Sequence, residues 1–128
     1  VIASHSNARG ACFHLRNLSD EMIRQLAERG GVTGINFCPS FLREEEPAAK
    51  KASTMDMVRH MKYLRNVGGI DIIGLGTDFD GFSGETDVPD TAHMQHLADV
   101  MSHDGFTDEE IEKVFSKNVL RVFRECWK

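Results

Sequence analysis

Three polar side chains stand at comparable places in this sequence, each shortly after an apolar segment: His5, Asn36 and Asp78. A neutral imidazole binds metals well and carries protons, and a carboxylate beside a metal-bound water is a usual proton acceptor. An asparagine in this position more often begins a loop by bonding to nearby backbone. We therefore take His5 and Asp78 as candidate functional residues and interpret Asn36 as structural.

Each candidate taken alone also has a simpler structural interpretation. A histidine after a strand is often only a hydrogen-bonded part of the framework, and Asp78, followed by Asp80 and Gly81, fits an ordinary turn. The functional interpretation depends on the matching positions of His5 and Asp78. If the apolar segments are parallel strands, both side chains lie at one C-terminal rim, where α/β proteins gather their functional groups.

Other motif interpretations fail on detail. The segment GLGTDFDG at residues 74–81 lacks the third glycine of a dinucleotide-binding fingerprint. A calcium loop that starts at the first aspartate of this segment would need glycine sixth and glutamate twelfth, but its glycine is fourth and Pro89 is twelfth. His93 and His96 could share a metal on one helix face, yet no third ligand is evident nearby, and a solvated helix face is the simpler interpretation.

The elements that must position these residues alternate between apolar and amphipathic segments. Residues 1–3, 31–35 and 70–75 are mostly apolar and do not alternate with polar residues, which is typical of parallel strands covered on both faces. Between them the sequence predicts helices over residues 19–30 and 53–68. In each, a serine or threonine that can cap the helix precedes an apolar stripe, and a glycine ends it.

Helices are also predicted after the third strand. Residues 91–101 carry apolar side chains at helical spacing, and Thr107 and Glu110 form a capping box before a pattern that continues through Leu120 and Phe123. The order strand, helix, strand, helix, strand, helices is typical of βαβ units and predicts an α/β fold with about three parallel strands. Such a sheet has two unpaired edges, so we expect further strands or a second copy to cover them.

Composition restricts the setting and the partners of the chain. The 128 residues have room for one domain, and a net charge of -5 without a lysine–arginine cluster argues against nucleic acid as a partner. No apolar stretch approaches the roughly 18 residues that a membrane span needs. Cys12, Cys38 and Cys126 are far apart and form no CxxC pair, so we expect a reducing, cytoplasmic setting without disulfides.

Several segments resemble the membrane (renal-type) dipeptidase family. They are IASHSNAR at residues 2–9, HLRNLSD at 14–20, GVTGINF at 31–37, GLGTDFDG at 74–81 and NVLRVF at 118–123. Together they follow the family's order over nearly the whole chain. The resemblance implies that residues 1–128 are the C-terminal part of a (β/α)8 TIM-type barrel. It also implies a complete protein that hydrolyses dipeptides with two zinc ions bridged by a carboxylate and a water.

Three residues take roles by that resemblance. His5 would be a ligand of one zinc ion, Arg16 would bind the C-terminal carboxylate of a dipeptide substrate, and Asp78 would be the catalytic residue that handles the proton of the attacking water. These roles agree with the chemistry of the side chains. A planar guanidinium fits a carboxylate in two-point contact, and a neutral imidazole is a good zinc ligand.

The chain departs from the family's pattern in two ways. Leu15 stands where many relatives have proline, so the loop that carries Arg16 has more freedom. The family's other metal-binding and oxyanion-side residues are absent, and because a catalytic zinc needs about three protein ligands, the chain alone should be inactive. Two alternatives stay open: another amidohydrolase-like activity, and a catalytically inactive relative that serves as a binding module. We expect the protein partner of this chain to be a second copy or the missing N-terminal part of the barrel.

Overall fold

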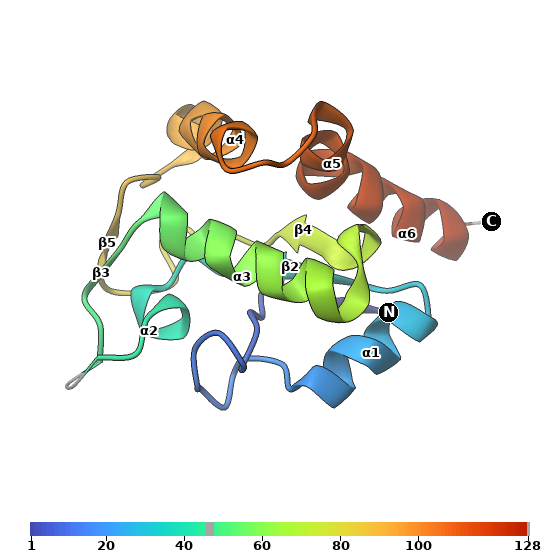
Figure 1. Ribbon diagram of the computed structural model, residues 1–128, viewed down its shortest axis with the longest axis horizontal. Coiled ribbons are helices and arrows are strands. Elements are labelled where there is room, and N and C mark those ends of the chain that lie inside the picture. The colour runs from blue at the N-terminus through green and yellow to red at the C-terminus, as the bar shows by residue number, and fades with distance from the viewer. Residues whose placement is uncertain (46–47, 128) are drawn as a thin grey trace.

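A parallel sheet of three short strands packs against helices (Figure 1). The computed structural model describes residues 1–45 and 48–127. β1 (Ile2–Ala3), β2 (Val32–Ile35) and β4 (Ile73–Leu75) lie side by side in the order β1-β2-β4, and both neighbouring pairs are parallel. The predicted parallel sheet is therefore confirmed.

Backbone pairing continues past the ends of these strands. The Ser6 N–H donates to the Gly34 carbonyl at 2.9 Å, and the Phe37 N–H donates to the Thr77 carbonyl at 3.1 Å. These bonds hold the segments that follow β1, β2 and β4 alongside one another. All three segments therefore leave the sheet at the same edge, which is where the candidate residues stand.

The third strand is shorter than the sequence predicts. The apolar pattern predicts a strand over residues 70–75, but Ile70–Ile72 forms a 3-10 turn and only Ile73–Leu75 is extended. The Asn118 side chain donates to one carbonyl of the turn and to one of the strand, both at 2.8 Å, and these bonds hold the turn in place. A continuous apolar run does not distinguish a strand from a buried turn that leads into it.

The two predicted helices between the strands form where their capping residues place them. α1 (Asp20–Glu28) begins at Ser19, whose hydroxyl accepts from a backbone N–H of the first turn at 3.3 Å. α3 (Thr54–Gly68) begins with a capping box. The Ser53 side chain accepts from the Asp56 N–H, and the Asp56 side chain accepts from the Ser53 N–H. α3 ends before Gly69, whose φ of 90° favours glycine.

The chain after β5 is helical and runs along the top and then down the right-hand side of Figure 1. It consists of a 3-10 turn and α4, followed by α5, a π-helical turn and α6: Thr91–His93, Met94–His103, Asp108–Glu112, Lys113–Lys117 and Asn118–Cys126. α3 and α6 both contact β2 and β4. Within the described residues, no helix is both long enough and apolar enough to cross a membrane.

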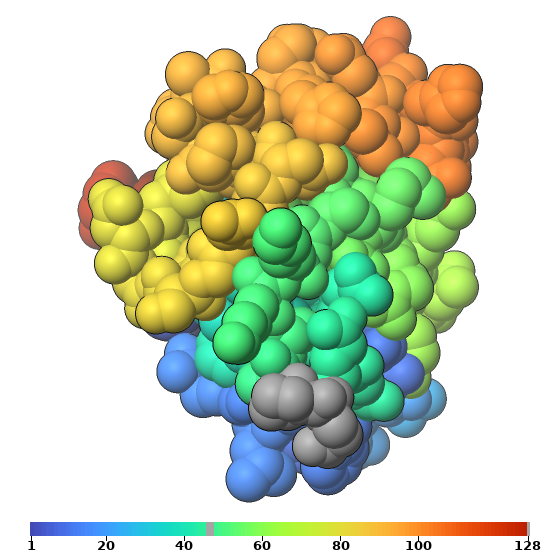
Figure 2. All heavy atoms as spheres, turned by 90° about the vertical axis from the view of Figure 1, so that its left-hand side faces the viewer, coloured from blue at the N-terminus to red at the C-terminus, as the bar shows by residue number. Residues whose placement is uncertain are grey.

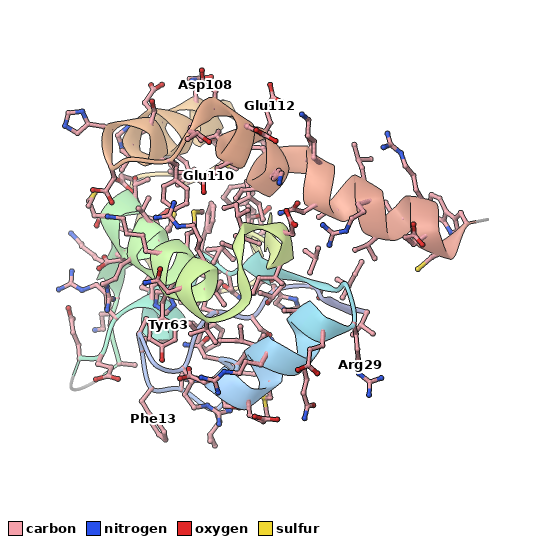
Figure 3. All side chains as sticks on the ribbon, turned by 45° about the vertical axis from the view of Figure 1, so that its right-hand side comes forward. Phe13, Arg29, Tyr63, Asp108, Glu110 and Glu112 are labelled. Atoms are coloured by element: carbon pink, nitrogen blue, oxygen red, sulfur yellow. The ribbon has the colours of Figure 1, made fainter. Side chains whose placement is uncertain are left out.

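The capping box predicted at the start of α5 is present. The Thr107 N–H donates to the Glu110 carboxylate at 3.0 Å, and the Glu110 N–H donates to the Thr107 hydroxyl at 3.1 Å. Glu110 faces α3, where it pairs with Arg65 at 3.3 Å, while Asp108 and Glu112 lie on the outer side of α5 (Figure 3). The box thus both starts α5 and fastens it to α3.

Three short elements were not predicted. α2 (Pro39–Leu42) is a single helical turn that begins with proline, and β3 (Lys51–Ala52) pairs in parallel with β5 (Glu85–Thr86). Figure 2 shows the green segment that contains β3 lying against the yellow segment that contains β5. Strands of two residues are too short to show a period in the sequence, and their pairing depends on contacts between residues far apart along the chain.

One hydrophobic core joins the sheet to the helices around it. Its largest fully buried apolar side chains come from α1, β2 and its following loop, α2, α3, β4 and α4: Ile23, Val32, Ile35, Phe37, Leu42, Met57, Met61, Leu64, Ile73, Leu97 and Met101. The loops that leave the C-terminal ends of the strands are anchored on this core, and they carry the candidate site.

Candidate active site

The order of the strands brings the predicted residues to one rim. His5 lies two residues after β1, Asn36 directly after β2 and Asp78 three residues after β4. Because β2 is the central strand, Asn36 lies between the other two. Its Nδ2 is 3.4 Å from both the His5 carbonyl oxygen and Asp78 Oδ2. The common rim expected for His5 and Asp78 is therefore present.

His5 contacts Arg16 directly. Arg16 Nη2 lies 3.2 Å from His5 Nε2, and His5 Nδ1 lies 2.7 Å from the Ser4 hydroxyl. A guanidinium has only donors, so Nε2 accepts this bond and Nδ1 carries the hydrogen of the neutral ring. The Nε2 lone pair is also the one that a metal ion would bind. A metal on Nε2 therefore requires the Arg16 guanidinium to move off it.

Aromatic rings support the loop that carries Arg16. Its guanidinium lies 5.5 Å from the centre of the Phe41 ring, and its backbone N–H donates to His14 Nδ1 at 3.1 Å. The His14 ring packs against the same Phe41 at 4.4 Å. Asp20, the nearest acidic residue after Arg16 in the sequence, accepts a bond from the Tyr63 hydroxyl at 2.7 Å. Arg16 is thus exposed but oriented toward the rim.

Asp78 sits in an uncommon backbone conformation. Its φ is 62°, in the left-handed region that few residues other than glycine and asparagine or aspartate adopt. The Gly81 N–H donates to the Asp78 carbonyl at 2.9 Å, and a Cβ on Gly81 would lie only 2.2 Å from Asp78 Oδ1. The turn interpretation of this segment is therefore correct as well. The turn presents the Asp78 carboxylate to Asn36.

A buried histidine that the sequence analysis does not identify connects the loop after β1 to the end of α2. His60 of α3 is fully buried, accepts from the Ala8 N–H at 3.2 Å and donates to the Leu42 carbonyl at 3.0 Å. Burial lowers the pKa of His60 to about 4, so the ring is neutral at neutral pH. Neither His60 nor Phe41 stands after a strand, and their roles depend on contacts that sequence spacing does not reveal.

The described residues provide only part of a metal site. Nowhere among residues 1–45 and 48–127 do three or more histidine, cysteine, aspartate or glutamate side chains gather closely enough to hold a metal ion. His93 and His96, considered as a pair, bond instead to Asp90 at 2.6 Å and to Asp87 at 3.2 Å. The His5 imidazole suits zinc as one ligand, but a complete site would need donors from elsewhere.

Comparison with known proteins gives the family of this chain. The sequence model of the family "Membrane dipeptidase (Peptidase family M19)" matches residues 1–127. An uncharacterized protein in the pqqA 5' region of Klebsiella pneumoniae is 35% identical over 99% of this chain and 47% of its own length. Dipeptidase tcpJ of Claviceps purpurea is 34% identical over 98% of this chain and 29% of its own length. The chain thus spans less than half the length of these relatives.

Solved structures agree in fold. Dipeptidase AC, a metallopeptidase of the same family, superposes with a TM-score of 0.91 at 29% identity, over 98% of this chain and 37% of its own. A metallopeptidase from Rhodobacter sphaeroides, solved with a phosphinate mimic of the dipeptide L-Ala-D-Ala, also has a TM-score of 0.91 at 29% identity, over 98% of this chain and 36% of its own. These relatives are TIM barrels, of which the present sheet and helices are a part. The chain belongs to the membrane dipeptidase family.

Proposed function

We propose that the complete protein is a zinc-dependent dipeptidase with a binuclear metal centre, and that this chain carries one side of its active site. One observation supports this most strongly. In a chain of the dipeptidase family, an imidazole, a guanidinium and a carboxylate meet at the C-terminal rim of a parallel sheet, through the contacts of His5 with Arg16 and of Asn36 with Asp78. This rim is where TIM-type barrels place their chemistry.

Each of the three residues has a separate task in the proposed reaction. His5 offers Nε2 as a metal ligand, because its Nδ1 hydrogen is directed to Ser4. Arg16 binds the free carboxylate of the dipeptide by two-point contact, which its planar fork favours. Asp78 takes the proton of the attacking water and returns it to the leaving amine. Zinc, when bound, supplies Lewis-acid polarisation of the peptide carbonyl and acidifies the water.

The proposal assigns Arg16 two positions. In the structure its guanidinium donates to His5 Nε2 at 3.2 Å. With His5 as a metal ligand, the guanidinium would be free to turn toward a substrate carboxylate, close to the Phe41 ring that lies 5.5 Å from it in the structure. The aromatic surface thereby limits how far the arginine can stray, which reduces the entropy lost on binding.

The test uses the full-length protein, because the described residues supply only part of a metal site. Purified protein should hydrolyse free dipeptides, lose the activity after dialysis against a chelator and recover it when zinc is added back. Roughly two zinc ions per chain should accompany full recovery, in line with a bridged pair of metals. Hydrolysis that survives complete removal of metal would contradict the proposal.

A further inference from the structure

Three asparagines lie buried beneath the rim. Asn7 and Asn36 are 0% exposed and Asn17 is 1% exposed. Burying a side-chain amide is costly unless its donors and acceptors find partners. Apart from the Asp78 carboxylate, the partners of these amides are backbone groups of the rim loops, including the carbonyls of Cys12 and Phe41 for Asn17, both at 2.9 Å. The asparagines therefore tie together the loops that carry His5, Arg16 and Asp78.

Asn7 holds the backbone of Asn36 at two points. The Asn36 N–H donates to Asn7 Oδ1 at 2.7 Å, and Asn7 Nδ2 donates to the Asn36 carbonyl at 2.8 Å. One side-chain amide thus pairs with both backbone groups of Asn36, as a neighbouring strand would do. This fixes the point at which the chain leaves β2.

The side chain of Asn36 is fixed in direction as well. Its Oδ1 accepts from the Cys38 N–H at 2.8 Å, so the amide cannot be turned over without placing two donors against each other. Nδ2 must then point the other way, toward the His5 carbonyl and Asp78 Oδ2, each at 3.4 Å. One amide group reaches the loops that follow both β1 and β4.

We propose that Asn36 is a positioning residue that holds the Asp78 carboxylate in register with the loop of His5, and that Asn7 acts through Asn36. The proposal rests on the dipeptidase function proposed above. Asp78 needs such a restraint because its left-handed backbone, at φ 62°, costs energy and depends on surrounding contacts to be held. A proton acceptor displaced by even about 1 Å loses much of its effect.

The experiment compares three variants of the full-length protein: Asn36→Asp, Asn7→Ser and, as matched control, Asn118→Asp. Asn118 is also buried, and its Nδ2 also serves two acceptors, the carbonyls of Ile70 and Ile73. The kcat and KM for a free dipeptide, the zinc content and the melting temperature are measured for each. Asn36→Asp places a carboxylate oxygen where the amide donor faced Asp78.

Asn36→Asp should lower kcat about tenfold or more, since a bond to a charged group contributes about that factor, while KM and zinc content stay within about threefold. Asn7→Ser should lower kcat about three- to tenfold, and it decides the matter if Asn36→Asp does not fold. Asn118→Asp should lower the melting temperature but keep kcat within about twofold.

Two results would overturn the inference alone: unchanged kcat in both site variants, or an equal loss of kcat in Asn118→Asp, which would mark general destabilisation. A wild type that hydrolyses no dipeptide would instead overturn the proposed function, and this inference with it. Because the wild type is assayed beside the variants, the two failures are distinct.

Discussion

At the scale of single residues, His5 and Asp78 differ in the atoms that they present at the rim. His5 directs Nδ1 to the Ser4 hydroxyl and leaves the Nε2 lone pair at the rim, where Arg16 donates to it at 3.2 Å. Asp78 directs Oδ2 to the Asn36 amide. The proposed proton acceptor and the proposed metal ligand thus lie on either side of the loop that leaves the central strand.

The carboxylate of Asp78 gives the first prediction. Asp78→Asn in the full-length protein keeps the shape of the side chain but removes its ability to take a proton, so kcat should fall by about 100-fold or more. The matched control is Asp80→Asn, which changes an exposed residue with the same left-handed backbone, at φ 65°. Steady-state kinetics with a free dipeptide check both. An Asp78→Asn variant no slower than the control would show that Asp78 only forms the turn.

At the scale of the elements, His60 joins α3 to two loops of the rim. It bonds to the Ala8 N–H in the loop after β1 and to the Leu42 carbonyl at the end of α2. Burial is the main cause that lowers its pKa to about 4; nearby Arg59 lowers it further, and the Leu42 bond and Asp56 oppose the shift. The bond from Ala8 exists only while His60 Nδ1 is unprotonated.

Stability should therefore depend on pH through His60. The folded-state pKa of about 4 lies below the usual value of 6.5, so the unfolded chain binds the extra proton as pH falls. The contribution of neutral His60 is complete above about pH 6.5 and is lost as pH falls toward about 4, by roughly 3 kcal/mol in all. Urea unfolding at several pH values measures this free energy. His60→Gln should flatten that part of the curve.

The matched control for His60 is His103→Gln, which removes an exposed imidazole from α4. It should leave the pH dependence of the unfolding free energy as in the wild type. If His60→Gln and the wild type lose stability equally on acidification, the buried histidine is not the group responsible.

Local signals in the sequence predicted most of the elements. Ser19, Ser53 and Thr107 start helices through bonds to backbone a few residues away, so their spacing alone identifies them. The parallel sheet and its common rim followed from the apolar segments and the polar residues after them. α2 is a single turn and β3 has two residues, too short for any period to show.

The parts of the site that could not be predicted depend on contacts between distant segments. The Phe41 ring lies 25 positions after Arg16, which it contacts. Asp78 lies 42 positions after Asn36, to which it is bonded. Asn36 was interpreted as structural, and its backbone bonds agree with that. Its contact with Asp78 adds a link to the site that the identity of the residue alone did not indicate.

At the scale of the whole molecule, the sheet has two open edges among residues 1–45 and 48–127. β1 and β4 each have a single neighbour in the three-stranded sheet. On α6, Leu120 is 44% exposed and Phe123 is 38% exposed, and Trp127, which stacks on Phe123, is 80% exposed. Unpaired strand edges beside an exposed apolar helix face favour association with further protein.

The isolated chain should therefore associate in solution. Light scattering of residues 1–128 should give a mass above that of a monomer, and Phe123→Lys should weaken the association. Leu15→Lys is the control, because Leu15 is 79% exposed but lies in the Arg16 loop, away from α6. A compact monomer of the isolated chain would contradict the expectation that its edges require partners.

The claim that the rim binds and cleaves dipeptides is tested most directly by Arg16. In the full-length protein, kcat/KM is measured for a free dipeptide and for the same dipeptide amidated at its C-terminus. Arg16→Ala should lower kcat/KM for the free dipeptide about ten- to 150-fold, the worth of a charge-assisted bond, and Arg16→Lys should recover only part of it. For the amidated dipeptide, already a poor substrate, the variants should match the wild type within about twofold. The control Arg24→Ala, at an exposed position of α1, should change neither value. An Arg16→Ala variant that hydrolyses the free dipeptide within about twofold of wild type would contradict the account.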